Sequence, residues 1–208
     1  MSAPDYDVAK RTADVIISAV ALLCTAPLQA VIAICVRQRL GPPIIFRQLR
    51  PGKDEDVFEL IKFRTMLRPD PVRGLVLDEQ RLTPFGRLLR STSLDELPTL
   101  WNVLKGDMSL VGPRPLLVRY LERYSPQERR RHEVRPGITG LAQVSGRNAL
   151  SWTDKFALDV EYVDHRSLRL DAHILLSTLA KVVRREGISD GRTATMSEFM
   201  GNGAEDLD

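Results

Sequence analysis

The chain has 208 residues, and 43% of them are hydrophobic, which suits one folded domain and excludes a disordered protein. Its 30 lysines and arginines barely exceed its 27 aspartates and glutamates, and no nucleic-acid-binding motif occurs, so a nucleic-acid-binding protein is not expected. The two cysteines, Cys24 and Cys35, lie in an apolar segment and show neither disulfide nor metal-ligand spacing.

The apolar segment 15–36 contains 22 residues without a charge, enough for a bilayer-spanning helix of about 20 residues. Pro27 removes a backbone hydrogen bond near its middle and predicts a kink. Basic residues flank both ends, at 10–11 and at Arg37 and Arg39, whereas a spanning helix usually carries its positive charge on one side. We therefore predict a re-entrant helix–break–helix with both ends in the cytoplasm. A straight transmembrane anchor and a buried core helix are the alternatives.

A run of basic residues follows this segment: Arg37, Arg39, Arg47, Arg50 and Lys53. Their charge suits anionic lipid head groups or phosphorylated ligands. A merely solvated basic surface explains the run equally well.

Downstream, residues 44–48 and 57–63 have the pattern of two short strands joined by a turn at Pro51-Gly52, which predicts a β-hairpin. Further predicted elements are a loop at 67–80, a short basic helix ending near Arg90, an amphipathic stretch at 116–132 interrupted by Pro126, a loop at 135–148, and helices at 151–163 and 168–185. The predicted fold is α+β and predominantly helical.

The sequence SLDEL at 93–97 contains an adjacent pair of acids. Ser93 with Glu96 three residues later has the spacing of a capping box, so a helix cap alone explains both acids. Pro98 is tolerated only in a first helical turn and predicts a helix that begins near Asp95. A helix start also attracts phosphate, and side chains on adjacent helical residues diverge by about 100°. One carboxylate could then face a phosphorus atom while the other holds a metal.

Two carboxylates suit phosphoryl chemistry, because Mg²⁺ typically uses one or two carboxylates plus substrate phosphates, and aspartate can accept a phosphoryl group covalently. The phosphates would also need cations. Candidates are Lys62, Arg90 and Arg114, the last held in a rigid turn between Pro113 and Pro115.

Three stretches, KFRTM at 62–66, SLDELPTLWNVLKGDMSLVGPRP at 93–115 and RPGITGLAQVSGRN at 135–148, closely resemble the bacterial sugar transferases, the small monotopic phosphoglycosyl transferases that prime glycan assembly. The resemblance implies transfer of a sugar-1-phosphate from a UDP-sugar to a polyprenyl phosphate such as undecaprenyl phosphate, with Mg²⁺, giving polyprenyl-diphosphate-sugar and UMP. It implies that Asp95 is the nucleophile and Glu96 the Mg²⁺ ligand, with Asp95 as a second candidate ligand. The implied substrate-binding residues are Lys62, Arg90, Pro113, Arg114, Pro115 and Asp171.

The resemblance also implies a re-entrant membrane helix at 1–40 kinked at Pro27, a catalytic domain at 41–201 with interfacial amphipathic helices, and a tail at 202–208. The expected location is the inner, cytoplasmic membrane with the active site on its cytoplasmic face, and downstream glycosyltransferases are candidate partners. Two positions depart from the family: Ala26, where many relatives have serine, and Leu141, where tryptophan is common. A catalytically silent scaffold of the same fold and a membrane-associated phosphohydrolase are the alternatives.

Overall fold

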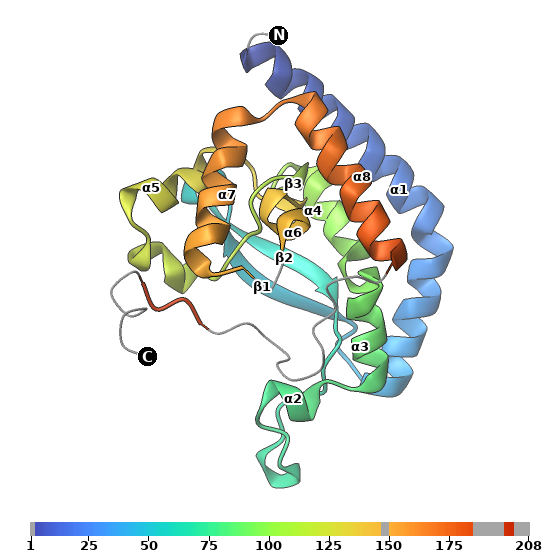
Figure 1. Ribbon diagram of the computed structural model, residues 1–208. Helices are drawn as coiled ribbons and strands as arrows, with labels where there is room; N and C mark the ends of the chain where they lie inside the picture. The colour runs from blue at the N-terminus through green and yellow to red at the C-terminus, as the bar shows by residue number, and fades with distance from the viewer. Residues whose placement is uncertain (1–2, 147–149, 185–197, 202–208) are drawn as a thin grey trace.

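The computed structural model describes residues 3–146, 150–184 and 198–201. One long helix, α1 (Ala3–Leu40), runs along one side of a body built from short helices and two small sheets (Figure 1). The predicted α+β, predominantly helical fold is confirmed. The other elements are β1 (Ile45–Pro51), η1 (Lys53–Glu55), β2 (Val57–Phe63), η2 (Pro71–Arg73), α2 (Asp78–Arg81), α3 (Pro84–Ser91), η3 (Leu94–Thr99), α4 (Leu100–Lys105), β3 (Ser109–Val111), η4 (Val118–Arg123), α5 (Pro126–Arg129), η5 (Arg130–Glu133), β4 (Gly137–Thr139), α6 (Leu141–Ser145), α7 (Trp152–His165) and α8 (Leu168–Arg184), where η marks 3₁₀ helices.

The predicted β-hairpin is confirmed. β1 and β2 pair antiparallel from Ile45 opposite Phe63 to Pro51 opposite Val57. The free edge of β2 is bound by side chains from the next elements, because the Thr99 hydroxyl donates to the Ile61 carbonyl at 2.8 Å. The Asn102 amide accepts from the Ile61 N–H at 3.2 Å and donates to the carbonyl of residue 59 at 2.8 Å. These bonds satisfy edge groups that would otherwise be unpaired and fix η3 and α4 against β2.

The second sheet contradicts the loop predicted at 135–148, because β4 pairs with β3 in parallel and α6 follows directly. Glycine makes this close approach possible: a Cβ at Gly137 would lie 2.1 Å from the backbone nitrogen of Gly112. The partner strand is distant in sequence, so no local periodicity could reveal the pairing. Residues 147–148 of the predicted loop lie outside the described residues.

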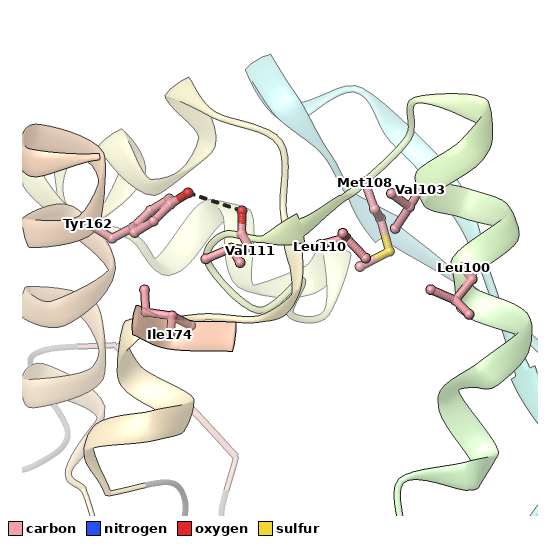
Figure 2. Close-up of a cluster of buried hydrophobic side chains, with 7 residues drawn as sticks. All are labelled: Leu100, Val103, Met108, Leu110, Val111, Tyr162 and Ile174. Atoms are coloured by element: carbon pink, nitrogen blue, oxygen red, sulfur yellow. Dashed lines mark hydrogen bonds between the residues drawn. The ribbon is translucent and has the colours of Figure 1, made fainter. Parts of the chain in front are cut away.

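The main core lies where these elements meet. It contains a set of buried side chains from α4, the β3 region, α7 and α8 (Figure 2): Leu100, Val103, Met108, Leu110, Val111, Tyr162 and Ile174. The Tyr162 hydroxyl lies 3.1 Å from the Val111 carbonyl oxygen and donates to a carboxylate of α8 at 2.8 Å, so the one polar atom of this ring is paired inside the core. The helices predicted at 151–163 and 168–185 are confirmed as α7 and α8, except that residue 185 lies outside the described residues.

The amphipathic stretch predicted at 116–132 is divided into short elements. The 3₁₀ helix η4 precedes α5, and Pro126 begins α5 at a position where its missing N–H costs nothing. The Ser125 hydroxyl accepts from the Glu128 N–H at 3.3 Å, and the Glu128 carboxylate accepts from the Ser125 N–H at 2.8 Å, which forms a capping box. The predicted loop at 67–80 contains η2 and the start of α2, and the tail predicted at 202–208 lies outside the described residues.

Both ends of α1 bind the same body. Near its start, Lys10 forms an ion pair with a carboxylate of α8 at 2.9 Å, and Arg11 donates to the carbonyls of Val103 and Leu104 at 2.7 and 2.9 Å, at the end of α4. Near its end, Ile32, Val36 and Leu40 of α1 are buried against β2 and α3. Their partners there are Phe63 and Leu89. The basic residues at 10–11 therefore make protein contacts, and their position says little about membrane sidedness.

The outer side of α1 is exposed and apolar. Only 11% of the most apolar 18-residue stretch of this helix is buried. By length and composition, the helix could cross a membrane. Leu23, the most exposed of these residues at 78%, lies near the middle of the helix. Soluble proteins rarely leave so large an apolar surface uncovered, so this side of α1 indicates a membrane contact.

The predicted break at Pro27 is wrong, because α1 continues as one helix through this proline. A proline inside a helix can bend it without ending it, since most surrounding backbone hydrogen bonds survive. The Thr25 hydroxyl donates to the Ala21 carbonyl at 2.6 Å, and Gln29 donates to Thr25 at 2.9 Å, which ties side chains to this part of the helix. Re-entrance itself concerns the membrane and stays a prediction.

Candidate functional site

The acidic pair lies in the 3₁₀ helix η3, between α3 and α4. The helix begins near Asp95 as Pro98 predicted, but as a 3₁₀ turn rather than an α-helix. The predicted capping box is absent: Ser93 adopts a left-handed conformation (φ 56°) and its side chain caps nothing. A residue in this conformation turns the chain sharply between α3 and η3. Asp95, two residues later, is only 4% exposed.

Three cations surround the pair, each delivered by a different element. Lys62 comes from β2, Arg90 from the last turn of α3, and Arg114 from the turn that follows β3. The Arg114 guanidinium donates to a Glu96 oxygen at 2.9 Å. All three predicted cations act electrostatically on Asp95, so the structure brings together five of the site residues predicted from the sequence.

Close packing of α3 positions Arg90. A Cβ at Gly86 would lie 1.8 Å from the carbonyl oxygen of Thr65, so only glycine allows α3 to approach this backbone. The Arg90 Nε then donates to the Thr65 hydroxyl at 3.0 Å. Thr65 belongs to the KFRTM stretch, which thereby supplies Lys62 and also orients a second cation of the site.

The pKa of Asp95 is raised from an ordinary value of 3.8 to about 6. Burial is the largest cause, and the negative charge of Glu96 raises the pKa further. The cations oppose this shift. Burial likewise lowers the pKa of Lys62 and of Arg90, whereas the Glu96 carboxylate raises the pKa of Arg114. The site therefore holds more positive charge than its two carboxylates neutralise, in partly desolvated surroundings that would strengthen binding of a phosphate.

A buried ion pair supports the Pro113-Arg114-Pro115 turn from behind. The Arg131 guanidinium donates to the Arg114 carbonyl at 2.7 Å and to the Asp159 carboxylate at 2.6 Å, and it also donates to the Tyr124 hydroxyl at 3.0 Å. Its side chain is 2% exposed. Sequence reasoning missed Arg131, because it lies in a run of basic residues, at 129–131, in which nothing distinguishes the buried one. It also missed Asn102, although a polar residue among apolar neighbours in LWNVL was a usable signal.

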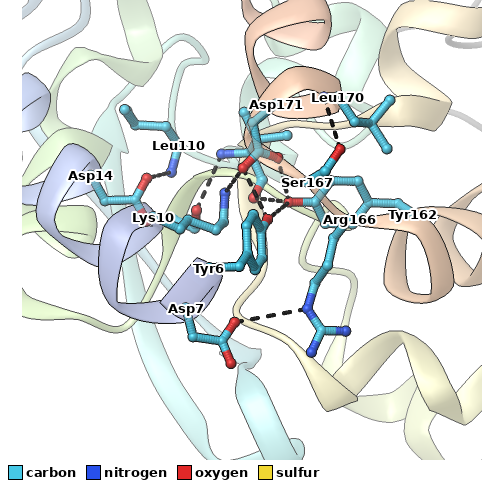
Figure 3. Close-up of polar contacts among 12 residues, drawn as sticks. Tyr6, Asp7, Lys10, Asp14, Leu110, Tyr162, Arg166, Ser167, Leu170 and Asp171 are labelled. Atoms are coloured by element: carbon cyan, nitrogen blue, oxygen red, sulfur yellow. Dashed lines mark hydrogen bonds and ion pairs between the residues drawn. The ribbon is translucent and has the colours of Figure 1, made fainter. Parts of the chain in front are cut away.

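Asp171 lies in a different polar cluster, at the start of α1 (Figure 3). Its carboxylate accepts from Tyr6 at 2.9 Å, from Lys10 at 2.9 Å and from Tyr162 at 2.8 Å. It is not among the charges that act on Asp95. Its observed contacts join α1 to α7 and α8, and the substrate-binding role predicted for it stays a prediction.

The acidic pair fits a Mg²⁺ ion that arrives with a phosphorylated substrate. Among residues 3–146, 150–184 and 198–201 no group of three or more His, Cys, Asp or Glu side chains could hold a metal. Mg²⁺ does not require such a group, since one or two carboxylates with substrate phosphates and waters suffice. Glu96, whose side chain is 24% exposed, is the more accessible of the two acids.

Comparison with known proteins decides the family. The sequence profile of the bacterial sugar transferases matches residues 5–185, which is most of the chain and includes every candidate site residue. The chain belongs to the bacterial sugar transferase family. The resemblance seen in the sequence is therefore confirmed, and this bacterial sugar transferase is an enzyme of the transferase class.

Individual relatives differ in length. The chain is 50% identical over 195 residues to the uncharacterized sugar transferase EpsL of Bacillus subtilis, covering 93% of this chain and 96% of EpsL. It is 39% identical over 188 residues to the UDP-glucose:undecaprenyl-phosphate glucose-1-phosphate transferase of Caulobacter vibrioides, covering 85% and 70%. It is 41% identical over 198 residues to the UDP-galactose-lipid carrier transferase of Erwinia amylovora, covering 86% of this chain but only 41% of that protein.

Proposed function

We propose that this chain transfers a sugar-1-phosphate from a UDP-sugar to undecaprenyl phosphate or another polyprenyl phosphate, in the first membrane step of a surface glycan pathway. The main support for this function is the buried Asp95 carboxylate, which lies beside Glu96. The positive charges of Lys62, Arg90 and Arg114 act on it. Relatives named as UDP-glucose:undecaprenyl-phosphate glucose-1-phosphate transferases support these substrate classes. Glycosyltransferases would consume the product.

In the first step, an Asp95 carboxylate oxygen attacks the sugar-linked phosphorus of the UDP-sugar. A bond forms from this oxygen to phosphorus, the bond from phosphorus to the bridging oxygen breaks, and UMP leaves with that oxygen. The product is a phosphosugar-aspartyl intermediate. In the second step, a phosphate oxygen of the lipid attacks the same phosphorus, and the Asp95 carboxylate leaves as polyprenyl-diphosphate-sugar forms.

The remaining groups position and neutralise the substrate. Lys62 and Arg90 offset the charge of the diphosphate, and Arg114, held by its flanking prolines and by Arg131, offers a planar guanidinium to a phosphate oxygen. Glu96 would hold Mg²⁺, with Asp95 as a second ligand. A bound Mg²⁺ would stabilise negative charge on the phosphate oxygens.

The direct test incubates the detergent-solubilised protein with undecaprenyl phosphate and a panel of UDP-sugars and measures UMP release. We expect release with at least one sugar, dependence on the lipid for repeated turnover, and loss of activity when EDTA removes Mg²⁺, with recovery when Mg²⁺ is restored. Release of free sugar-1-phosphate without the lipid would favour the phosphohydrolase. No release with any sugar would favour the catalytically silent scaffold.

The raised pKa of Asp95 predicts a pH dependence. The nucleophile must be ionised, so we expect kcat/KM to fall about tenfold per pH unit below about pH 6 and to level off above it. Replacing Glu96→Gln removes a neighbouring negative charge, so the inflection of the residual activity should move to lower pH. The profile should be measured at several Mg²⁺ concentrations, since a bound cation also stabilises the carboxylate. A profile that stays level from pH 5 to 8 would contradict this role for Asp95.

The same proposal places the chain on the cytoplasmic face of the inner membrane as a monotopic protein, with α1 entering and leaving on one side. The contacts of both ends of α1 with one body support this, because a straight crossing would separate the ends by about 30 Å of hydrocarbon. A soluble nucleotide sugar and a lipid phosphate could then meet at one carboxylate.

Thiol labelling tests this topology. After removal of Cys24 and Cys35, single cysteines at Ala3 and Gly41 in sealed vesicles should be modified by a membrane-impermeant reagent from the same side. Cysteine at the exposed Gln127, on α5, serves as a reference for the side that carries the body. Labelling of positions 3 and 41 from opposite sides would establish the straight transmembrane anchor instead.

A further inference from the structure

The basic run at 37–53, predicted to meet anionic lipid or phosphorylated ligands, is divided by the structure. Arg47 pairs with Glu59, and the Lys53 amine lies 3.9 Å from the Asp54 carboxylate. A third member of the run, at position 50, is half-buried and donates to a glutamine side chain and to a backbone carbonyl. These three contact protein groups. Only the two arginines in the last turn of α1 remain as candidates for an external anion.

Two further arginines join them at the end of α1. The set, called the arginine patch below, is exposed and consists of Arg37, Arg39, Arg68 and Arg87. Within the described ranges 3–146, 150–184 and 198–201, no carboxylate forms an ion pair with any of them. The acidic segment that follows Arg68 in the sequence, at 70–79, neutralises part of its own charge, because Asp70 pairs with Arg73 and Asp78 with Arg81.

Contacts between their elements bring the segments that carry the four arginines together. The Arg39 guanidinium lies 5.1 Å from the centroid of the Phe85 ring, which precedes Arg87 by two residues on α3. The buried Arg64 guanidinium donates to the carbonyl of Gly41 just after α1. Burial lowers the pKa of Arg64, and the nearby positive charge of Arg68 lowers it further. The end of α1, the segment after β2 and the start of α3 therefore meet here.

Exposed apolar side chains lie on the same elements. Val31 and Ile34 on α1 are 57% and 56% exposed, and Leu88 on α3 is 50% exposed. Val72 is 97% exposed, in the segment that projects from the body beyond α3 (Figure 1). Apolar side chains beside unpaired arginines match the boundary of a bilayer, where hydrocarbon lies next to charged head groups.

We propose that the arginine patch binds the head groups of anionic phospholipids and so fixes the end of α1 and the start of α3 at the bilayer surface. Charge complementarity and the neighbouring apolar side chains select a lipid surface over a soluble anion. Arg90 of the candidate site lies on the same α3, so the patch would also hold the catalytic cations close to the plane in which a lipid phosphate arrives.

The test compares binding of the full chain to phosphatidylcholine vesicles with and without phosphatidylglycerol. The variant replaces all four patch arginines by glutamine. A matched control removes the same charge from exposed cations that have carboxylate partners elsewhere: Arg47, Lys53, Arg119 and Arg129.

We expect phosphatidylglycerol to strengthen vesicle binding of the unaltered chain and of the control. At low salt, the affinity of the patch variant for these vesicles should be lower by up to roughly 1,000-fold. High salt should remove the gain in all three. Equal losses in the patch variant and the control, or no gain from phosphatidylglycerol, would overturn the proposal. So would competition by inorganic phosphate at low millimolar concentration. Vesicle binding can be measured without any enzymatic turnover. In neutral detergent, which has no anionic head groups, UMP release by the patch variant should be unchanged.

Discussion

Replacing Asp95→Asn is expected to reduce UMP release by at least about 1,000-fold, the scale of loss when a covalent nucleophile is removed. The amide nitrogen and oxygen of asparagine keep the shape of the side chain but cannot attack phosphorus as a carboxylate does. Asp95 is buried and repelled by Glu96, so the substitution also removes an unfavourable charge, and we expect no loss of thermal stability.

Two controls separate chemistry from binding for this variant. UDP should bind the Asp95→Asn protein about as well as the unaltered one, because Lys62, Arg90 and Arg114 remain. Asp56→Asn, at an exposed aspartate outside the site, should keep full activity. Full transfer by Asp95→Asn would exclude a covalent intermediate on this residue.

Replacing Arg131→Gln is expected to cost about 3–5 kcal/mol of unfolding free energy at pH 7, because it leaves the Asp159 carboxylate buried without its partner. The cost should shrink as the pH falls, since burial already raises the pKa of Asp159 and the unpaired carboxyl can take up a proton. Urea unfolding at several pH values measures this. Arg130→Gln is the matched control: its side chain pairs with Glu133 and Asp164 at the surface, so little change is expected.

The same arginine is also expected to position the catalytic turn. Arg131 donates to the Arg114 carbonyl, so its loss should raise the KM for the UDP-sugar more than it lowers kcat. The double variant Arg131→Met with Asp159→Leu separates the two effects. Apolar replacement of both partners should recover much of the stability without restoring the KM. Recovery of both together would assign Arg131 a purely structural role.

Elements governed by local rules could be predicted from the sequence. The β-hairpin follows from alternating side chains around Pro51-Gly52, and α3 follows from a proline at its first position with Thr83 as its cap. The start of η3 follows from Pro98. The capping box predicted at Ser93 failed because the chain must turn sharply between α3 and η3, and the left-handed conformation of Ser93 provides that turn instead.

Features that depend on distant contacts could not be predicted. The pairing of β3 with β4 joins segments separated by several other elements, and a loop and a short strand look alike locally. The basic residues at 10–11 and the run at 37–53 looked alike as surface charge, yet the structure gives buried partners to the first and leaves Arg37 and Arg39 exposed. Burial of a charge is decided by tertiary packing, which a sequence pattern does not encode.

The candidate site combines both kinds of information. The adjacent acids and the Pro113-Arg114-Pro115 turn carried the prediction, because the chemistry of each can be inferred from residue types alone. The support behind them could not be inferred: the bonds of Asn102 to the β2 edge are long-range. These bonds fix α4 against the strand that carries Lys62. Equally distant contacts position the other two cations: Thr65 accepts from Arg90, and Arg131 donates to the Arg114 carbonyl.

Mass spectrometry of the intact protein after incubation with UDP-sugar and Mg²⁺, without any lipid acceptor, tests the central claim most directly. We predict a stoichiometric burst of UMP and a mass increase of one phosphosugar on the peptide that contains Asp95. The added mass should disappear when undecaprenyl phosphate is supplied, as polyprenyl-diphosphate-sugar forms. Turnover with both substrates but no adduct and no burst, or an adduct on another residue, would contradict the two-step mechanism at Asp95.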